Sequence, residues 1–294
     1  STGIMNKILI IGLGLIGGSI ARTIKSKKLD YEVFAIDQNQ DSIDVAKSSN
    51  VIVEGSTKKS FIHSKDFHLI IISTPISAFF EYADLVSRTQ SIVAVTSSSF
   101  DAVCRFVESS SENDSFKRSL VFSHPIAGSE KSGFENSTSN IFEEKIIAIA
   151  GYEDSRKNQR EVINFWKELN SIPKELTMQQ HEQVLMLTSH LPHVLAFIMI
   201  KVLFEKSSDE GTKNLTKSLK DFSGGGLKEF LRLASSDSQV WTDIIISNKK
   251  ELKKGIELFE SELGNFKKLL TNIEKEEVLE ILENVKDFVD SNWT

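Results

Sequence analysis

The sequence has one cysteine, no excess of basic residues and no long uninterrupted apolar run. Because Cys104 stands alone among 294 residues, no disulfide can form within the chain, which is usual in a reducing cytoplasm. The 35 Lys and Arg against 41 Asp and Glu leave a net charge of −6, which argues against a nucleic-acid partner. No run reaches the roughly 18 apolar residues of a membrane span. We therefore expect a cytoplasmic protein with neither a nucleic-acid nor a membrane partner.

The first half of the chain alternates strand-like and helix-like segments. Continuous apolar runs are typical of strands buried on both faces, and strands that alternate with helices predict a parallel sheet. The predicted helices include 15–29 and 41–50. The predicted strands are 7–13, 31–37, 67–74, 91–98, 119–124 and 144–151. The fold class is therefore predicted as α/β, with a Rossmann-type doubly wound parallel sheet.

After Gly151 the pattern becomes helical, and we find no strand-like alternation beyond about residue 152. The predicted domains are a nucleotide-binding domain over residues 5–152 and an all-helical domain over residues 153–294. Pro192 predicts a kink or local break in the apolar helix 182–204. The stretch "VLAFIMIKVLF" is too apolar for a small helical domain to cover alone, so we expect a homodimer formed through this domain.

A glycine-rich turn, "GLGLIGG", follows the first strand and opens the first helix. Gly12, Gly14 and Gly17 form a G-x-G-x-x-G pattern: the first permits a tight turn, the second a close approach to a pyrophosphate, and the third close helix–strand packing. The helix start at Leu15 and Ile16 presents free N–H groups to phosphates. The alternative is a glycine turn without a ligand.

Two further segments complete the predicted cofactor site. Asp37 ends the second strand, where a carboxylate accepts hydrogen bonds from ribose hydroxyls and repels a 2′-phosphate, which favours NAD over NADP. Thr74 and Pro75 end the third strand at the same edge of the sheet, although Pro75 could equally be a simple strand terminator. NAD is therefore the predicted cofactor.

The histidines and one arginine are the candidate chemical groups. His124 ends a strand of the nucleotide-binding domain and so lies at its ligand-binding edge. His190 and His193 share a helix face, either as core histidines or as ligands; a zinc site would need a third ligand, and no metal site is predicted. Arg232 suits a bidentate contact with a carboxylate if it faces a cleft, or belongs to a solvated helix face.

Several stretches together resemble the prephenate dehydrogenases, enzymes of tyrosine biosynthesis. These stretches are "GLGLIGGS", "HPIAGSEKSG", "SHLPH" and "LRLASSDSQVWTDIIISN". The resemblance implies NAD-dependent oxidation of prephenate with loss of carbon dioxide to give 4-hydroxyphenylpyruvate. It also implies a nucleotide-binding domain followed by a helical dimerisation domain.

The resemblance also assigns roles to individual residues. His124 matches the histidine that takes the proton of the substrate ring hydroxyl, and Arg232 matches the arginine that binds a substrate carboxylate. His193 matches a second substrate-binding histidine. The other residues expected near the substrate are Glu130 at the entrance of the active site, Ser129, His190 and Trp241.

One segment departs from the family's pattern. The family often has Asp-x-Gly-Ser-x-Lys after the fourth strand, with a serine that helps to orient the catalytic histidine, whereas this chain has "TSSSFDAV". Ser99 is the predicted counterpart of that serine, with Ser98 as the alternative. Which residue orients His124 is left open.

Three alternatives to prephenate oxidation follow from the sequence. An enzyme for arogenate, or for both substrates, would differ by a carboxylate that receives an ammonium group, and Glu130 or Glu229 could supply it. A β-hydroxyacid dehydrogenase would need a catalytic lysine where this chain has "HLPH". A non-catalytic nucleotide sensor would bind NAD without turnover.

Overall fold

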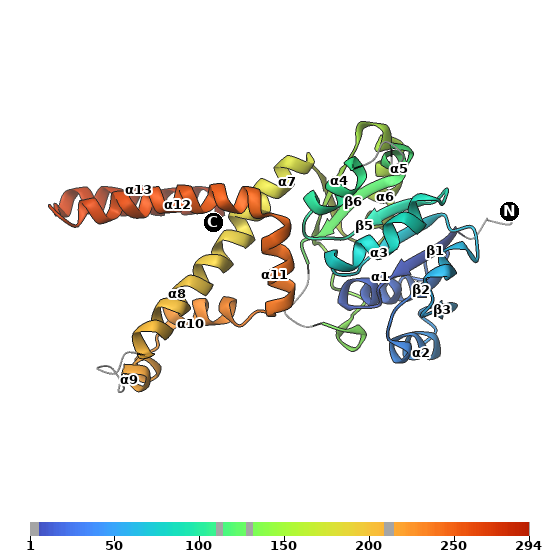
Figure 1. Ribbon diagram of the computed structural model, residues 1–294, viewed down its shortest axis with the longest axis horizontal. Helices are drawn as coiled ribbons and strands as arrows, with labels where there is room; N and C mark the ends of the chain where they lie inside the picture. Colours follow the sequence, from blue (N-terminus) through green and yellow to red (C-terminus); the bar gives the residue numbers. More distant parts are fainter. Residues whose placement is uncertain (1–5, 110–113, 128–131, 209–214, 294) are drawn as a thin grey trace. The chain divides into compact units, whose positions relative to one another are not determined.

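The computed structural model describes residues 6–109, 114–127, 132–208 and 215–293. The chain forms two compact units, residues 1–249 and 250–294, and each is described by itself. Figure 1 shows the sheet and the helices of the first unit, with strand β1 and helix α1 in blue and helix α8 in yellow.

An eight-stranded sheet organises the first unit, in the order β3-β2-β1-β4-β5-β6-β7-β8. The strand order reverses between β1 and β4, so the carboxyl ends of these two strands flank a topological switch point, the usual ligand-binding place in such sheets. The strands are β1 (Asn6–Ile11), β2 (Tyr31–Ile36), β3 (Glu54–Ser56), β4 (Leu69–Ile72), β5 (Ile92–Val95), β6 (Leu120–Pro125), β7 (Ile146–Gly151) and β8 (Ile172–Glu175).

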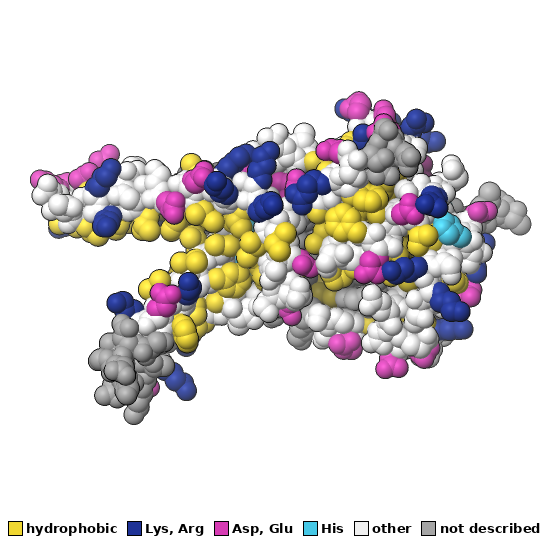
Figure 2. All heavy atoms as spheres, viewed as in Figure 1, with side chains coloured by type: hydrophobic (Ala, Val, Ile, Leu, Met, Phe, Trp, Pro, Cys, Tyr) yellow, Lys and Arg dark blue, Asp and Glu magenta, His cyan; other side chains and the backbone are white. Residues whose placement is uncertain are grey.

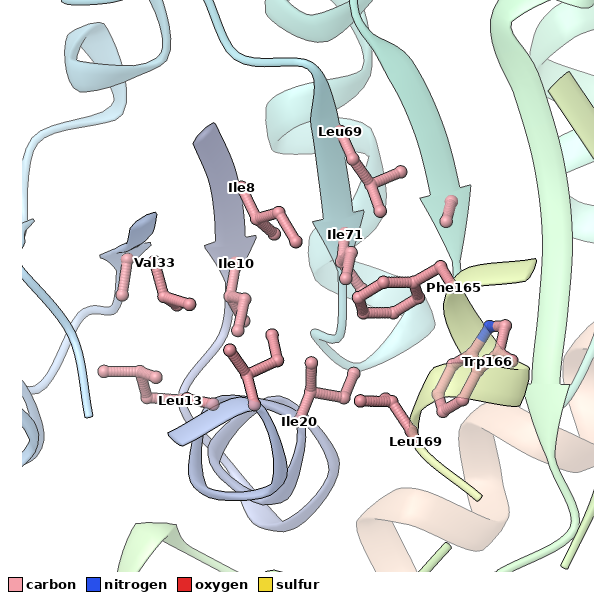
Figure 3. Packing of buried hydrophobic residues seen from close by; sticks show 14 of the residues in the cluster. Ile8, Ile10, Leu13, Ile20, Val33, Leu69, Ile71, Phe165, Trp166 and Leu169 are labelled. Atoms are coloured by element: carbon pink, nitrogen blue, oxygen red, sulfur yellow. The ribbon is translucent and has the colours of Figure 1, made fainter. Parts of the chain in front are cut away.

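Apolar clusters cover both faces of this sheet, as the continuous apolar runs predict. Ile8 and Ile71 belong to one cluster, Leu9 and Ile72 to the other. Figure 3 shows the first cluster, in which Ile20 of α1 lies against the strands. The helices along this part of the chain are α1 (Leu15–Ser26), α2 (Gln40–Ser48), α3 (Ile76–Ser87), α4 (Asp101–Glu108), α5 (Asp114–Ser119) and α6 (Arg156–Glu168), with 3₁₀ turns at Lys59–His63, Phe134–Asn136 and Glu153–Ser155.

One strand pair departs from the predicted parallel sheet, because β7 runs antiparallel to β6 with His124 opposite Ala148. Parallel neighbours need a long crossover, usually a helix. The connection over residues 126–145 contains, in its described portion, only the three-residue turn Phe134–Asn136. The chain therefore returns beside β6 in the opposite direction.

The prediction that no strand follows residue 152 is wrong. Strand β8 pairs in parallel with β7, and α6 packs Phe165 and Trp166 onto the sheet (Figure 3). The sequence "IPKE" of β8 is short, largely exposed and contains Pro173, so it shows no apolar run and no alternation. The division of the chain at 152/153 stays a prediction.

Beyond Glu175, the described residues contain helices and no further strand. A π-helical turn, Met186–His190, interrupts the long apolar helix just before Pro192, which accounts for the local break that the proline predicts. Helix α10 packs against α8 (Figure 1). These helices are α7 (Met178–Leu185), α8 (Leu191–Ser208), α9 (Leu215–Asp221), α10 (Gly225–Ala234) and α11 (Ser238–Ser247).

By length and composition alone, the helical stretch Met178–Lys206 could cross a membrane, a criterion that core helices of soluble proteins also meet. The three histidines of this stretch interrupt its apolar residues, so the sequence shows no uninterrupted apolar run of that length.

The second unit consists of most of helix α12 (Lys249–Leu269) and of α13 (Lys275–Trp293). Apolar residues on both helices are exposed, among them Leu258 and Phe288.

Candidate active site

The glycine turn has the geometry that a dinucleotide requires. Gly12 has a φ of 97°, and a Cβ there would lie 2.9 Å from the carbonyl oxygen of Ser73. A Cβ on Gly17 would lie 1.9 Å from the carbonyl oxygen of Gly12, so this position accepts only glycine. A Cβ on Gly14 would meet no atom within 4 Å. The second glycine therefore borders open space at the start of α1, where a phosphate can approach the backbone.

Asp37 lies beside this turn and helps to hold it. Its Oδ2 accepts a 2.6 Å hydrogen bond from the N–H of Leu13, and its Oδ1 accepts one of 2.8 Å from the N–H of Asn39. The carboxylate is half-buried, and each oxygen keeps a second lone pair for a ribose hydroxyl.

The remaining predicted cofactor residues border the same turn. Leu15 and Ile16 open α1 and are half-buried, and Pro75 is exposed at the start of α3. The Thr74 hydroxyl is buried and makes no hydrogen bond to any described residue, although the adjacent Gly12 turn could bring a ligand to it. The open space at Gly14, the carboxylate of Asp37 and the hydroxyl of Thr74, which pairs with no described residue, are features that a bound NAD molecule would use, so these residues fit this cofactor.

His124 is joined to the helical part through a buried histidine. Its Nδ1 lies 2.9 Å from Nε2 of His181, and the Nδ1 of His181 lies 3.2 Å from Oε1 of Glu182. The His181 ring stacks on Phe100 with centroids 3.7 Å apart. A β6 histidine is therefore held by residues of helix α7.

Ser99, the predicted counterpart of the family's orienting serine, is connected to His124 through Glu182 and His181. The hydroxyl of this buried serine donates a 3.2 Å hydrogen bond to Oε2 of Glu182, and the N–H of Phe100 donates one of 2.6 Å to Oε1. Ser99 is thus two side chains away from His124. The question that the sequence leaves open, which residue bonds to His124, has His181 as its answer in the structure.

A cavity of about 690 Å³ brings four of the predicted residues together. His193 stacks on Trp241 with centroids 3.8 Å apart, and its Nδ1–H can donate to the Ser189 carbonyl at 2.8 Å. Arg232 is 67% exposed and pairs with Glu229 at 3.0 Å, so its guanidinium stays accessible. The cavity is lined by His124, Pro125, Ile126, Ala127, Leu185, Thr188, Ser189, His193, Arg232, Leu233, Ser235, Ser236 and Trp241.

His190 is not among the residues that line this cavity. Its ring is buried, and its Nδ1 accepts a 3.0 Å hydrogen bond from the Asn248 amide, which also donates to the carbonyl of Glu182 at 3.1 Å. The predicted pair therefore divides: His193 lies on the cavity wall, whereas His190 is a core histidine satisfied by Asn248.

Burial lowers the pKa of three imidazoles in this region. It lowers the pKa of His124 well below 6.5, and the neighbouring His181 and His190 lower it further. Burial also lowers the pKa of His190 to about 4 and that of His193 to a smaller extent. At neutral pH, His124 is therefore able to accept a proton.

Ser129 and Glu130 lie outside the described residues. In the part of the chain that is described, no group of three His, Cys, Asp or Glu side chains could hold a metal ion.

Sequence reasoning missed Glu182, His181 and Asn248 as parts of the site. The only signal was the adjacent pair "HE" close to a long apolar stretch, since a carboxylate that becomes buried usually has a partner. Nothing in the sequence connects that pair to His124, which lies 57 residues earlier.

The sequence profile of the prephenate dehydrogenase nucleotide-binding domain matches residues 20–172, and that of the prephenate dehydrogenase dimerization domain matches residues 177–284. The chain belongs to the prephenate dehydrogenase family. It is an NAD-dependent dehydrogenase with a nucleotide-binding domain and a dimerisation domain. The first profile ends at the first residue of β8, and the second begins one residue before α7.

Individual family members are similar over nearly the whole chain. Prephenate dehydrogenase of Bacillus subtilis is 26% identical over 96% of this chain and 75% of its own length. Cyclohexadienyl dehydrogenase of Zymomonas mobilis is 27% identical over 97% of this chain and 94% of its own. The crystal structure of Aquifex aeolicus prephenate dehydrogenase with hydroxyphenyl propionate and NAD+ is 28% identical, with a TM-score of 0.87 and 99% of both chains covered.

Proposed function

We propose that the protein is a prephenate dehydrogenase of tyrosine biosynthesis, which converts prephenate to 4-hydroxyphenylpyruvate and carbon dioxide. The observation that carries the proposal is the cavity shared by His124 and Arg232. It offers a neutral base and an accessible guanidinium to one small molecule. A dicarboxylate with an oxidisable ring hydroxyl uses both groups.

The roles of the side chains follow from their contacts. His124 accepts the proton of the ring hydroxyl, a contribution of about 10²–10⁴-fold in rate for a general base. Bound NAD supplies the acceptor for the hydride that leaves the same ring carbon. Loss of carbon dioxide then returns the electron pair to the ring, which becomes aromatic, and the phenol oxygen regains a proton.

Arg232 and His193 bind the substrate in this proposal. Arg232 pairs with a carboxylate, for which the guanidinium fork is suited. The Nδ1–H of His193 is committed to the Ser189 carbonyl, so the neutral ring offers Nε2 as an acceptor, and stacking on Trp241 holds its plane.

A second candidate is arogenate, alone or alongside prephenate. It is favoured by the similarity to a relative named cyclohexadienyl dehydrogenase and by Glu229, whose carboxylate lies 3.0 Å from Arg232 and could receive an ammonium group. The experiment is a steady-state comparison of prephenate and arogenate, each with NAD and with NADP. A preference for prephenate with NAD supports the proposal, whereas a more than tenfold preference for arogenate overturns it.

We further propose that the protein is a cytoplasmic homodimer without a nucleic-acid or membrane partner. Helix α8 exposes Ile198, Val202 and Phe204, the last of them 68% exposed, and Figure 2 shows hydrophobic side chains gathered along this helix. A contiguous apolar surface of this kind marks an interaction site. A second copy of the chain covers it in this proposal, and a strictly monomeric species at micromolar concentration in light scattering contradicts it.

A further inference from the structure

A buried row of hydrogen bonds runs from the two residues before helix α4 to His124. It begins at the N–H of Phe100 and the hydroxyl of Ser99, passes through the carboxylate of Glu182 and the ring of His181, and ends at Nδ1 of His124. His181 is fully buried and Glu182 nearly so. We infer that Glu182 and His181 are positioning residues that hold His124 in the tautomer whose Nε2 is the proton acceptor.

The carboxylate sets the direction of every hydrogen bond in the row. Three groups that can donate surround its oxygens, at 2.6 Å from Phe100, 3.2 Å from Ser99 and 3.2 Å from His181, and the carboxylate accepts from all three. The Nδ1 of His181 therefore donates to Glu182, and its Nε2 is the nitrogen that faces His124 as an acceptor.

The same argument continues to the catalytic ring. Because Nε2 of His181 accepts, Nδ1 of His124 donates across the 2.9 Å contact, and Nε2 of His124 keeps its lone pair. This nitrogen is the one left for a ligand in the cavity that His124 lines. The stacking of His181 on Phe100, with an interplanar angle of 12°, keeps the relay ring from rotating.

The row also has a role during proton transfer, a point that rests on the proposed function. When Nε2 of His124 accepts the hydroxyl proton, the ring becomes a cation in a buried place. Its Nδ1–H bond to His181, which is backed by the Glu182 carboxylate, stabilises that cation, much as a buried aspartate does in a catalytic triad. Between the substrate and the row only this proton is transferred, while the hydride and carbon dioxide leave the substrate as described above, and the proton returns to the oxygen when the phenol forms.

Kinetics of two His181 variants test the inference. His181→Phe keeps a ring to stack on Phe100 but removes the acceptor, so we expect kcat to fall by about 10²-fold or more, with the KM of the substrate and the affinity for NAD unchanged. His181→Gln offers an amide oxygen to His124 and should recover at least about tenfold of that loss. The matched control is His68→Gln, because His68 forms an exposed pair with Glu161 at 3.2 Å.

The outcomes separate a positioning role from a structural one. A kcat of His181→Phe within about threefold of the wild type, or equal losses in the Phe and Gln variants, overturns the inference. If His181→Phe does not fold, the inference is judged from the kcat of His181→Gln and from the wild-type spectra described below. If the wild type oxidises arogenate rather than prephenate, the proposed substrate fails, and the same comparison is made with arogenate.

A second readout needs no substrate. In ¹⁵N-histidine-labelled enzyme at neutral pH, with the signals assigned through His124→Asn, we expect a protonated Nδ1 and a bare Nε2 on His124. In His181→Phe this tautomer should no longer dominate. A protonated Nε2 on His124 in the wild type overturns the inference whether or not the proposed reaction occurs.

Discussion

In the sheet part, over residues 6–175, apolar side chains such as Ile8 and Ile71 are buried by the chain itself, whereas helix α8 leaves Ile198 and Phe204 exposed. The buried polar side chains also differ: those of the sheet part are serines and threonines, whereas the helical part buries His181, Glu182 and His190. A sheet covered on both faces completes its own core. The helical part instead uses its interior to build the site and leaves apolar surface for a partner.

His124 connects the two parts, and replacing it should have the largest effect. We expect His124→Asn to lower kcat by about 10²–10⁴-fold, because the proton acceptor is lost. NAD affinity, measured by fluorescence titration, should stay unchanged, since the glycine turn lies on other strands. Retained turnover would remove His124 from the mechanism.

Replacing Arg232 tests the contribution of the helical part to substrate binding. Arg232→Ala should raise the KM of the substrate by about 10–10²-fold, because a hydrogen-bonded charge contact contributes about 1.5–3 kcal/mol. Its matched control is Arg156→Ala, since Arg156 forms an exposed i,i+3 pair with Glu153 at 2.8 Å, like the Arg232–Glu229 pair. Equal KM values for the two variants would contradict the assignment.

Two equally exposed valines test whether the apolar surface of α8, and not that of the sheet part, forms the dimer interface. Val202 of α8 and Val45 of α2 are each 49% exposed. We expect Val202→Asp to shift the protein from dimer to monomer in light scattering, because a charge would be buried at the interface, while Val45→Asp leaves the dimer intact. A dimer in both variants would move the interface away from this face of α8.

The smallest effect concerns the buried histidine of the helical part. The folded pKa of His190, about 4, lies below 6.5, so the unfolded state binds a proton first as pH falls. The contribution of the neutral His190 to the free energy of unfolding is therefore fully present above pH 6.5 and decreases as the pH falls toward 4. At about pH 5.5 the loss due to His190 is about 1 kcal/mol.

His190→Gln should remove this portion of the pH dependence in denaturant unfolding, because the amide can accept from Asn248 without titrating. The control is His63→Gln, at an exposed position. An unchanged slope between pH 7 and 5.5 in His190→Gln would argue against a neutral, buried imidazole.

The features that local patterns determine were predictable. Continuous apolar runs predict β1, β2 and β4, and the glycine spacing with Asp37 predicts the cofactor turn, because each depends on neighbours in the sequence. The profile and structure comparisons confirm the predicted fold class, the NAD cofactor and the family. Strand β8 escaped prediction because an exposed edge strand needs no apolar pattern.

Contacts across the chain decided the rest. Asn248 lies between α11 and α12, and its amide bonds to His190 and to the Glu182 carbonyl. The sequence by itself determined that His124 ends a strand at the cofactor edge. Only the tertiary structure decided that His181 bonds to His124 and Glu182 to His181. A hydrogen-bond partner 57 residues away produces no periodic pattern in the sequence.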